Sequence, residues 1–200
     1  MLMDLIEYAR EEDEALRDRV FNGEVLLDGD FSGLEFENVT FQRCRFAGCD
    51  FTAARFYGVK FLGCDLSGCF FRSGHFQDCA MEDCRANGAS FDESVFRRCA
   101  FTDSLFPYAN FPETSWEAVK ITSTSLSHGA FRAAKFKRLT LKQADLSGAE
   151  FFKASLKGVD LSDCNIEGIV VSQSMTELRG AKINPGQAVD LMPLLGVELI

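Results

Sequence analysis

The side chains best able to do chemistry in this 200-residue chain are eight cysteines and two histidines. Cysteine and histidine can ligate zinc, and an even number of cysteines can build a disulfide framework. The chain has no Cys-x-x-Cys pair, and its cysteines are instead separated by multiples of five residues: Cys44, Cys49, Cys64, Cys69, Cys79, Cys84, Cys99 and Cys164. This spacing favours free, reduced thiols that pack as small hydrophobic side chains.

Large apolar residues follow the same period of five. From Phe21 to Val171 one stands at every fifth position except Ala86, and 18 of the 20 phenylalanines lie in this register. A period of five would scatter these residues around a helix, and on a straight strand it would alternate them between faces. The chain must therefore turn once per repeat. Ten repeats have Gly at the second of two corner positions, and we predict a polygonal coil with inward-facing apolar residues.

Individual repeats resemble a known consensus. The segments 64–68 (Cys-Asp-Leu-Ser-Gly) and 144–148 (Ala-Asp-Leu-Ser-Gly) resemble the pentapeptide-repeat pattern of a small residue, Asp or Asn, Leu or Phe, and two polar or small residues. The resemblance implies an all-β solenoid, a right-handed quadrilateral β-helix with four sides and twenty residues per coil. The spacing alone does not distinguish four sides from three.

A filled coil leaves little room for an active site. On a four-sided coil His75 and His128 fall on different sides, so they cannot share a metal ion. A packed interior also offers no concave pocket for a substrate. We therefore expect no catalytic residue, no cofactor and no metal, and the sequence predicts a non-enzymatic rod that binds another macromolecule.

The two ends differ from the repeats. A solenoid exposes an apolar cross-section at each end and needs caps. We predict an N-terminal helical cap over residues 1–20, the repeats over 21–175, and a capping and dimerisation segment over 176–200 with a helix from Asn184-Pro185 to Gly196. The last segment has more apolar residues than one rod end buries, which favours a homodimer. The candidate interface residues are Leu191, Met192, Leu194, Leu195, Val197, Leu199 and Ile200.

Two segments resemble one subgroup of the pentapeptide proteins. Residues 180–200 and the stretch 121–127 are similar to Qnr-type quinolone-resistance proteins, which bind DNA gyrase and topoisomerase IV and resemble the DNA that these enzymes hold. The resemblance implies a type II topoisomerase partner, partial DNA mimicry and modulation of quinolone-type inhibition. The unbroken register has no room for the loop insertions of many Qnr proteins. The alternative is a protein–protein interaction scaffold with another partner.

Charge selects a candidate surface. The net charge of −9 argues against a general nucleic-acid binder, since phosphate contacts need clustered cations. The side through Phe31 and Phe51 has the largest acidic excess, and its acids are the candidate partner-binding residues: Asp30, Asp50, Asp92, Glu93, Glu113 and Glu150. The side through Phe36 and Phe56 has the most bases. We expect no direct contact with nucleic acid or membrane and, without a recognisable signal peptide, a cytoplasmic location.

One exception to the period predicts an irregular region. Ala86 stands where its neighbours one coil away are the larger Leu66 and Phe106, so a cavity or an inward bend is expected. Pro107 and Pro112 follow at corner positions, where each is expected to remove one N–H donor from the backbone hydrogen bonds between coils. We therefore predict distorted coils between residues 81 and 121.

Overall fold

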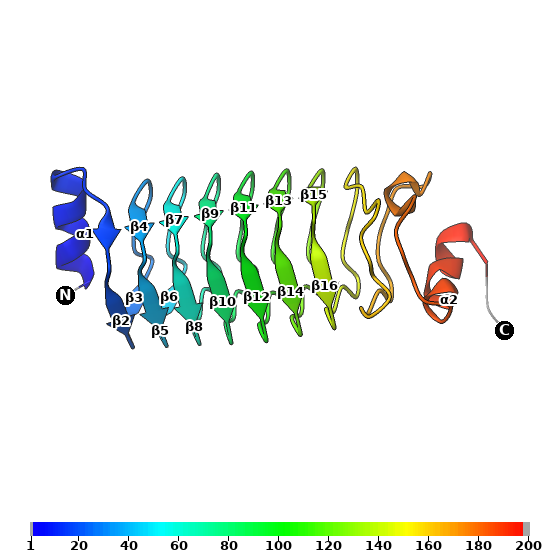
Figure 1. Ribbon diagram of the computed structural model, residues 1–200, viewed down its shortest axis with the longest axis horizontal. Coiled ribbons are helices and arrows are strands. Elements are labelled where there is room, and N and C mark those ends of the chain that lie inside the picture. The colour runs from blue at the N-terminus through cyan, green and yellow to red at the C-terminus, as the bar shows by residue number, and fades with distance from the viewer. Residues whose placement is uncertain (1, 198–200) are drawn as a thin grey trace.

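The computed structural model describes residues 2–197 as a rod, in which the chain winds as a parallel solenoid between two terminal helices (Figure 1). The N-terminal helix α1 comprises Leu2–Glu11, and the C-terminal helix α2 comprises Gln187–Leu191. Short 3₁₀ helices, η1 (Thr176–Leu178) and η2 (Met192–Leu195), lie near the C-terminal end. The predicted all-β solenoid with a helix at each end is confirmed.

The strands lie in one row per side of the coil. Side 1 contains β1 (Leu16–Arg17), β4 (Glu35–Glu37), β7 (Arg55–Tyr57), β9 (His75–Gln77), β11 (Val95–Arg97), β13 (Ser115–Glu117) and β15 (Lys135–Lys137). Side 2 contains β2 (Val20–Asn22), β5 (Thr40–Gln42), β8 (Lys60–Leu62), β10 (Ala80–Glu82), β12 (Ala100–Thr102), β14 (Lys120–Thr122) and β16 (Thr140–Lys142). Side 3 begins with β3 (Val25–Leu27) and β6 (Arg45–Ala47) and continues as single bridges, and side 4 consists of single bridges.

The pairing register establishes four sides. Phe36 pairs with Phe56 on side 1 and Phe41 with Phe61 on side 2. The bridges of sides 3 and 4 have the same offset of twenty residues, as in Asp50 with Phe70. Four repeats of five residues therefore complete one coil, which the spacing of residues along the sequence could not decide. Near the C-terminal end Asp160 pairs with Lys182, so the last coil is two residues longer.

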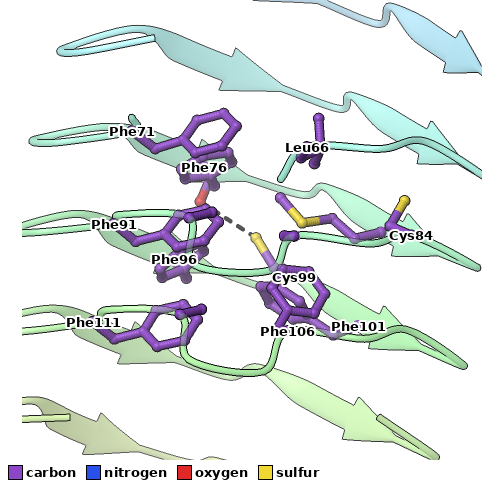
Figure 2. Close-up of a cluster of buried hydrophobic side chains, with 14 of the residues drawn as sticks. Leu66, Phe71, Phe76, Cys84, Phe91, Phe96, Cys99, Phe101, Phe106 and Phe111 are labelled. Carbon is purple, nitrogen blue, oxygen red and sulfur yellow. Dashed lines mark hydrogen bonds between the residues drawn. The ribbon is translucent and has the colours of Figure 1, made fainter. Parts of the chain in front are cut away.

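Aromatic rings stack along the inside of sides 1, 2 and 4. Phe56 lies between Phe36 and Phe76 with ring centroids 5.2 and 4.6 Å away and nearly parallel planes. Figure 2 shows the corresponding column of Phe71, Phe91 and Phe111 on side 4. Rings of adjacent sides meet edge to face, as do Phe41 and Phe46 at 87°. Both arrangements are favourable aromatic geometries, so the period of five produces a core rich in packed rings.

The cysteines occupy the small inward positions, as predicted. All eight lie in the described part of the chain, and all are buried and unpaired. The Sγ of Cys99 donates to the carbonyl oxygen of Phe76 at 3.4 Å (Figure 2). The Sγ of Cys79 makes the corresponding contact with the Phe56 carbonyl at 3.3 Å. These thiols thus fill the corners of the core and bond to its backbone.

The corners explain why proline is tolerated. The second corner residue has a left-handed backbone, both at glycines such as Gly58 (φ 64°) and at other residues such as Asp83 (φ 53°). The N–H of the first corner residue does not join the ladder; that of Thr52 donates to the Asp50 side chain instead. Pro107 and Pro112 occupy this first position, and their carbonyls accept ladder bonds from Gly88 and Glu93 of the preceding coil. The expected loss of a ladder donor is therefore wrong.

The predicted distortion around Ala86 is also wrong. Ala86 is fully buried, and its N–H donates to the Leu105 carbonyl at 2.8 Å in the regular ladder. The paired strands β10, β12 and β14 run without a break through residues 80–122. Side chains of the adjoining coils close over the small residue without displacing its backbone.

The irregularity lies further along the chain. Among the described residues, no backbone hydrogen bond joins 134–143 to 155–163, so β15 and β16 are the last strands of sides 1 and 2. Sides 3 and 4 keep their ladder there, for example between Leu146 and Asn165. Leu139 occupies a small inward position in this coil and is half-buried, and it lines an apolar cavity of about 10 Å³. Leu139 thus lies where two sides lose their ladder, although Leu34, also at a small inward position, lies in a regular one.

The N-terminal helix is shorter than predicted. It ends at Glu11, and Leu16 already belongs to the first strand of side 1. Asp13 and Asp18 have left-handed backbones (both φ 52°), which begins the corner geometry that a helix cannot contain. The helix buries Leu2, Ile6 and Ala9, as a cap must. The division of the chain at residues 20 and 175 into three units remains a proposal.

Replacing Phe56 by Asp should prevent folding. The change removes about 1.5–3 kcal/mol of apolar burial and places a carboxylate between two phenyl rings. The control is Gln42→Asp, an outward position on side 2, which should leave the melting temperature within a few degrees. Circular dichroism melts of both variants test the assignment, and equal melting temperatures would contradict it.

Candidate partner-binding surfaces

Outward side chains form columns because every coil has the same length. On side 1 opposite charges meet one coil apart: the nearest N–O distances are 2.7 Å for Arg17–Glu37, 2.8 Å for Arg55–Glu35 and 2.6 Å for Arg98–Asp78. Glu117 lies 2.8 Å from Lys137 and 2.9 Å from Arg138. Exposed pairs of this kind add little stability. They do neutralise most of side 1 in the N-terminal half of the rod.

The predicted acidic residues lie on side 4 and its corner, in separate groups. Asp30 and Asp50 pair in the ladder. The Arg10 guanidinium lies 2.9 Å from the Asp30 carboxylate. Hydrogen bonds from the Ser32 hydroxyl, Arg10 and the Ser32 N–H lower the pKa of Asp30 to about 2. Asp30 thus fastens helix α1 to the first coils as well as facing solvent.

Among the six predicted acids, Asp92, Glu93 and Glu113 form the densest group. They occupy one corner in two successive coils, which the Glu93 N–H links through the Pro112 carbonyl at 2.9 Å. Asp92 lies 3.8 Å from Arg72, and Glu93 accepts a 3.3 Å hydrogen bond from the Ser73 hydroxyl. We call these three residues the acidic corner.

Glu150 lies apart from the other predicted acids. It belongs to the same outward column of side 4 as Asp50, but uncharged residues separate the two. These residues are Phe70, Ser90, Asn110 and Ala130. At ~4.8 Å per coil, this neutral stretch is roughly 24 Å long. The six acids therefore share a side without forming one continuous surface.

Sorting the sequence by sides missed a second acidic group. Glu82, Asp83 and Asp103 occupy the corner after side 2, diagonally opposite the acidic corner, again in two successive coils. The left-handed backbones of Asp83 and Asp103 mark both as corner residues. The signal was present in the sequence as two adjacent acids followed twenty residues later by another. Assigning each corner to a single side concealed it.

A buried glutamine holds the C-terminal helix on the rod. The Gln187 Nε2 donates to the carbonyls of Leu161 and Cys164, both at 2.7 Å. Its Oε1 accepts from the Asn184 N–H at 2.8 Å, and the Asn184 Oδ1 accepts from the Gln187 N–H at 3.0 Å. This reciprocal pair is a capping box, and helix α2 begins at Gln187, two residues after the Pro185 start that the sequence predicted. The predicted stop at Gly196 is confirmed by its left-handed backbone.

Glu177 closes the open end of the last coil. It is buried, and its carboxylate accepts from the Lys153 N–H at 3.0 Å and from the Ser172 hydroxyl at 2.7 Å. Burial raises the pKa of Glu177, but these hydrogen bonds outweigh burial and hold that pKa below its usual range. This role could not be predicted from the sequence, because the partners of Glu177 come from an earlier coil and a turn.

The candidate dimer residues divide into buried and exposed sets. Leu191, Met192 and Leu194 are half-buried against the rod end. Leu195 and Val197 are 59% and 39% exposed. Leu199 and Ile200 lie outside the described residues. Val189, which was not among the predicted interface residues, is also exposed on helix α2.

Residues 2–197 contain no group of three or more His, Cys, Asp or Glu arranged to hold a metal ion. The two histidines lie apart: His128 stacks on Tyr108 with ring centroids 4.9 Å apart, and His75 lies beside Tyr57. Within the same residues, no helix has both the length and the apolar character needed to cross a bilayer.

Comparison with known proteins identifies the repeats. The family model described as "Pentapeptide repeat region" matches residues 54–131, and that described as "Pentapeptide repeats (8 copies)" matches residues 30–72 and 131–168. No curated protein matches the chain significantly.

Several solved structures are similar. A trypsin-treated variant of QnrB1, a plasmid-mediated fluoroquinolone resistance protein, is 25% identical with a TM-score of 0.50; the match covers 93% of this chain and 99% of QnrB1. Full-length QnrB1 is 20% identical with a TM-score of 0.37, over 89% of this chain and 100% of that one. HetL, involved in heterocyst differentiation regulation in the cyanobacterium Nostoc, is 17% identical with a TM-score of 0.39, over 90% of this chain and 96% of HetL.

Replacing Glu177 by Gln should destabilise the protein by about 1–3 kcal/mol at pH 7, since a buried group loses charge-assisted hydrogen bonds. The folded-state pKa is depressed, so this stabilisation is present above the unfolded pKa of ~4.3 and is lost as pH falls through the folded pKa. Urea denaturation at pH 7 and below pH 4 should show that the difference in unfolding free energy between variant and parent is smaller at the lower pH. Glu167→Gln, at an exposed residue, is the control and should change little. A difference in unfolding free energy that stays constant with pH would contradict the role of the carboxylate.

Proposed function

This chain belongs to the pentapeptide repeat family, and from that premise we propose that it is a non-catalytic rod that binds a type II topoisomerase. In this proposal it acts as a partial DNA mimic on DNA gyrase or topoisomerase IV and modulates quinolone-type inhibition. The acidic corner of Asp92, Glu93 and Glu113 is the observation that carries the proposal. The similarity to QnrB1 along nearly the whole rod supports the same partner class.

The binding mechanism is electrostatic. A surface that holds DNA must be basic, so an acidic ridge on a rod can occupy it and compete with DNA. The acidic corner projects its carboxylates at a left-handed turn, where Glu93 and Glu113 have φ of 59° and 56°. The acidic corner adjoins side 1 as well as side 4, so a partner would approach from side 4 to stay clear of the arginines and lysines of side 1.

The mimicry is partial. Duplex DNA carries one charge per ~1.7 Å of helix axis. The acidic corner has three carboxylates over two coils, which at ~4.8 Å per coil is about half that density. Arg72 and Arg132 occupy the same corner on either side of it. We therefore confine the proposed contact to the middle of the rod.

We further propose a homodimer joined through the C-terminal end. Val189, Leu195 and Val197 are exposed apolar residues on one short segment, which Gln187 holds against the last coil. A two-fold interface would bury this segment against its own copy. The eight unpaired cysteines support a reducing compartment, which agrees with a cytoplasmic location.

A scaffold for a different protein is the second candidate. Its support is a set of exposed apolar residues away from the ends: Phe70 is 52% exposed on side 4, and Leu105 and Tyr108 are exposed on side 3 and its corner. Aromatic residues of this kind dominate many protein interfaces. Binding of a protein other than a topoisomerase through Phe70 or Tyr108 would favour the scaffold function.

Reversing the acidic corner with Asp92→Lys, Glu93→Lys and Glu113→Lys should abolish inhibition of gyrase supercoiling and leave the melting temperature nearly unchanged. The matched control reverses the opposite corner with Glu82→Lys, Asp83→Lys and Asp103→Lys, an identical change in net charge. Supercoiling assays with and without a fluoroquinolone measure both variants. The proposed contact is refuted if the acidic-corner variant inhibits as well as the parent, and the scaffold is favoured if the parent neither binds nor inhibits gyrase.

Replacing Val189 and Leu195 by Asp should convert the proposed dimer to monomers without unfolding the rod, because both residues are exposed and Gln187 is retained. Val20→Asp with Leu27→Asp, two exposed apolar residues at the other end, is the control and should remain dimeric. Sedimentation velocity at micromolar concentration distinguishes the states. An intact protein that sediments as a monomer would rule the dimer out.

A further inference from the structure

Charge is distributed unevenly along the rod. The first forty residues contain twelve acids and three bases, which equals the whole net charge of −9. Residues 131–157 contain two acids and seven bases. We call these seven the basic band: Arg132, Lys135, Lys137, Arg138, Lys142, Lys153 and Lys157. All seven are exposed.

The coil geometry gathers six of these seven residues on side 1 and its two corners, and Lys142 lies at the end of β16 on side 2. Lys135 and Lys137 flank the inward Phe136 on strand β15. Arg132 and Lys153 lie at the corner before β15, where the Ala133 N–H bonds to the Phe152 carbonyl at 2.8 Å. Lys157 lies in the next coil, next to Leu156, which lines the same cavity as Phe136 and Leu139.

Few acids neutralise this surface. Lys137 and Arg138 share the single carboxylate of Glu117, and no ion pair within 4.0 Å is found for the other five members among the described residues. In the N-terminal half of side 1, by contrast, arginines pair with a carboxylate one coil away. The basic band is therefore an uncompensated positive surface, although the rod as a whole is acidic.

We propose that the basic band binds the phosphate backbone of duplex nucleic acid. Two hydroxyl residues, Ser115 and Ser155, occupy the position of Lys135 one coil before and one coil after it, and hydroxyl side chains, with Arg and Lys, are usual donors to phosphate. A protein interface needs apolar anchors at its centre, and the band offers only Phe152 at its edge, 37% exposed. The two corners of side 1 are about 10 Å apart, since three extended residues separate them, and this is close to the ~12 Å width of the major groove.

The acidic net charge does not prevent this contact. From Phe36 to Phe136 the ladder has five coil steps, which at ~4.8 Å each separates the acidic end from the band by roughly 24 Å. The Debye length at physiological salt is ~8 Å, so repulsion from the acidic end is largely screened. The expectation of no nucleic-acid contact came from the net charge, which conceals this separation. The inference does not depend on a topoisomerase partner.

Fluorescence anisotropy with a fluorescein-labelled 24-base-pair duplex of random sequence tests the proposal without any topoisomerase. The intact protein should bind at 50 mM salt, and with about four phosphate contacts its affinity should fall with a log–log salt slope of about −4. Lys135→Glu with Lys157→Glu should weaken binding about tenfold or more. The control, Lys60→Glu with Arg85→Glu, makes an identical charge change on sides 2 and 3 and should stay within about twofold of the parent.

Three outcomes would overturn the proposal. The first is no binding by the intact protein at 50 mM salt. The second is an equal loss in the two double variants, which would indicate a general charge effect; circular dichroism melts of both guard against unfolding. The third is displacement of the duplex by poly-glutamate at a lower concentration of negative charge than unlabelled DNA requires, which would assign the band to an acidic protein.

Discussion

The twenty-residue coil repeat is the constraint on which the rest of this structure depends. Along sides 1 and 4 the inward phenyl rings pack on the ring one coil away, and each backbone ladder bond joins the same two positions. Stacking fails if one coil gains or loses a residue, because every later ring would shift by one position. The two extra residues of the chain are accordingly placed in the last coil, where Asp160 pairs with Lys182 and no further ring column follows. A core built in this way is stable only as a stack of neighbours.

Much of the fold could be predicted because the inward residues repeat at a fixed spacing. Phe56 and Cys79 could be assigned to the interior from the period alone, and both are buried. Two kinds of feature could not be predicted. The number of sides depends on which coils pair, and a local period does not contain that information. The effect of one unusual residue depends on its surroundings: Ala86 is accommodated by its neighbours, whereas Leu139 lies where two sides lose their ladder.

The candidate surfaces could be predicted only in part, for a related reason. Asp30 and Asp50 were correctly expected side by side, since both occupy the outward position of side 4. The group formed by Glu82, Asp83 and Asp103 was missed because a corner belongs to two sides at once. Gln187 and Glu177 were missed for a different reason. Their partners are backbone groups of distant coils, and a side chain that satisfies backbone groups leaves no pattern in the sequence.

The repeat also decides how such a rod can present charge. A residue and its counterpart twenty positions later lie one coil apart, so opposite charges at that spacing cancel locally, as they do for Arg17 and Glu37. A net electrostatic potential strong enough to attract a partner remains only where charges twenty residues apart do not alternate in sign. It does so in three places: the acidic N-terminal end, the two acidic corners in the middle, and the basic band near the other end. The acidic N-terminal end and the basic band lie several screening lengths apart along the rod, so these two can act on separate partners. The acidic corner adjoins the band directly, where the Glu113 N–H donates to the Arg132 carbonyl. Net charge is therefore a poor guide to what a solenoid binds, and the charge of each coil is the quantity to compare.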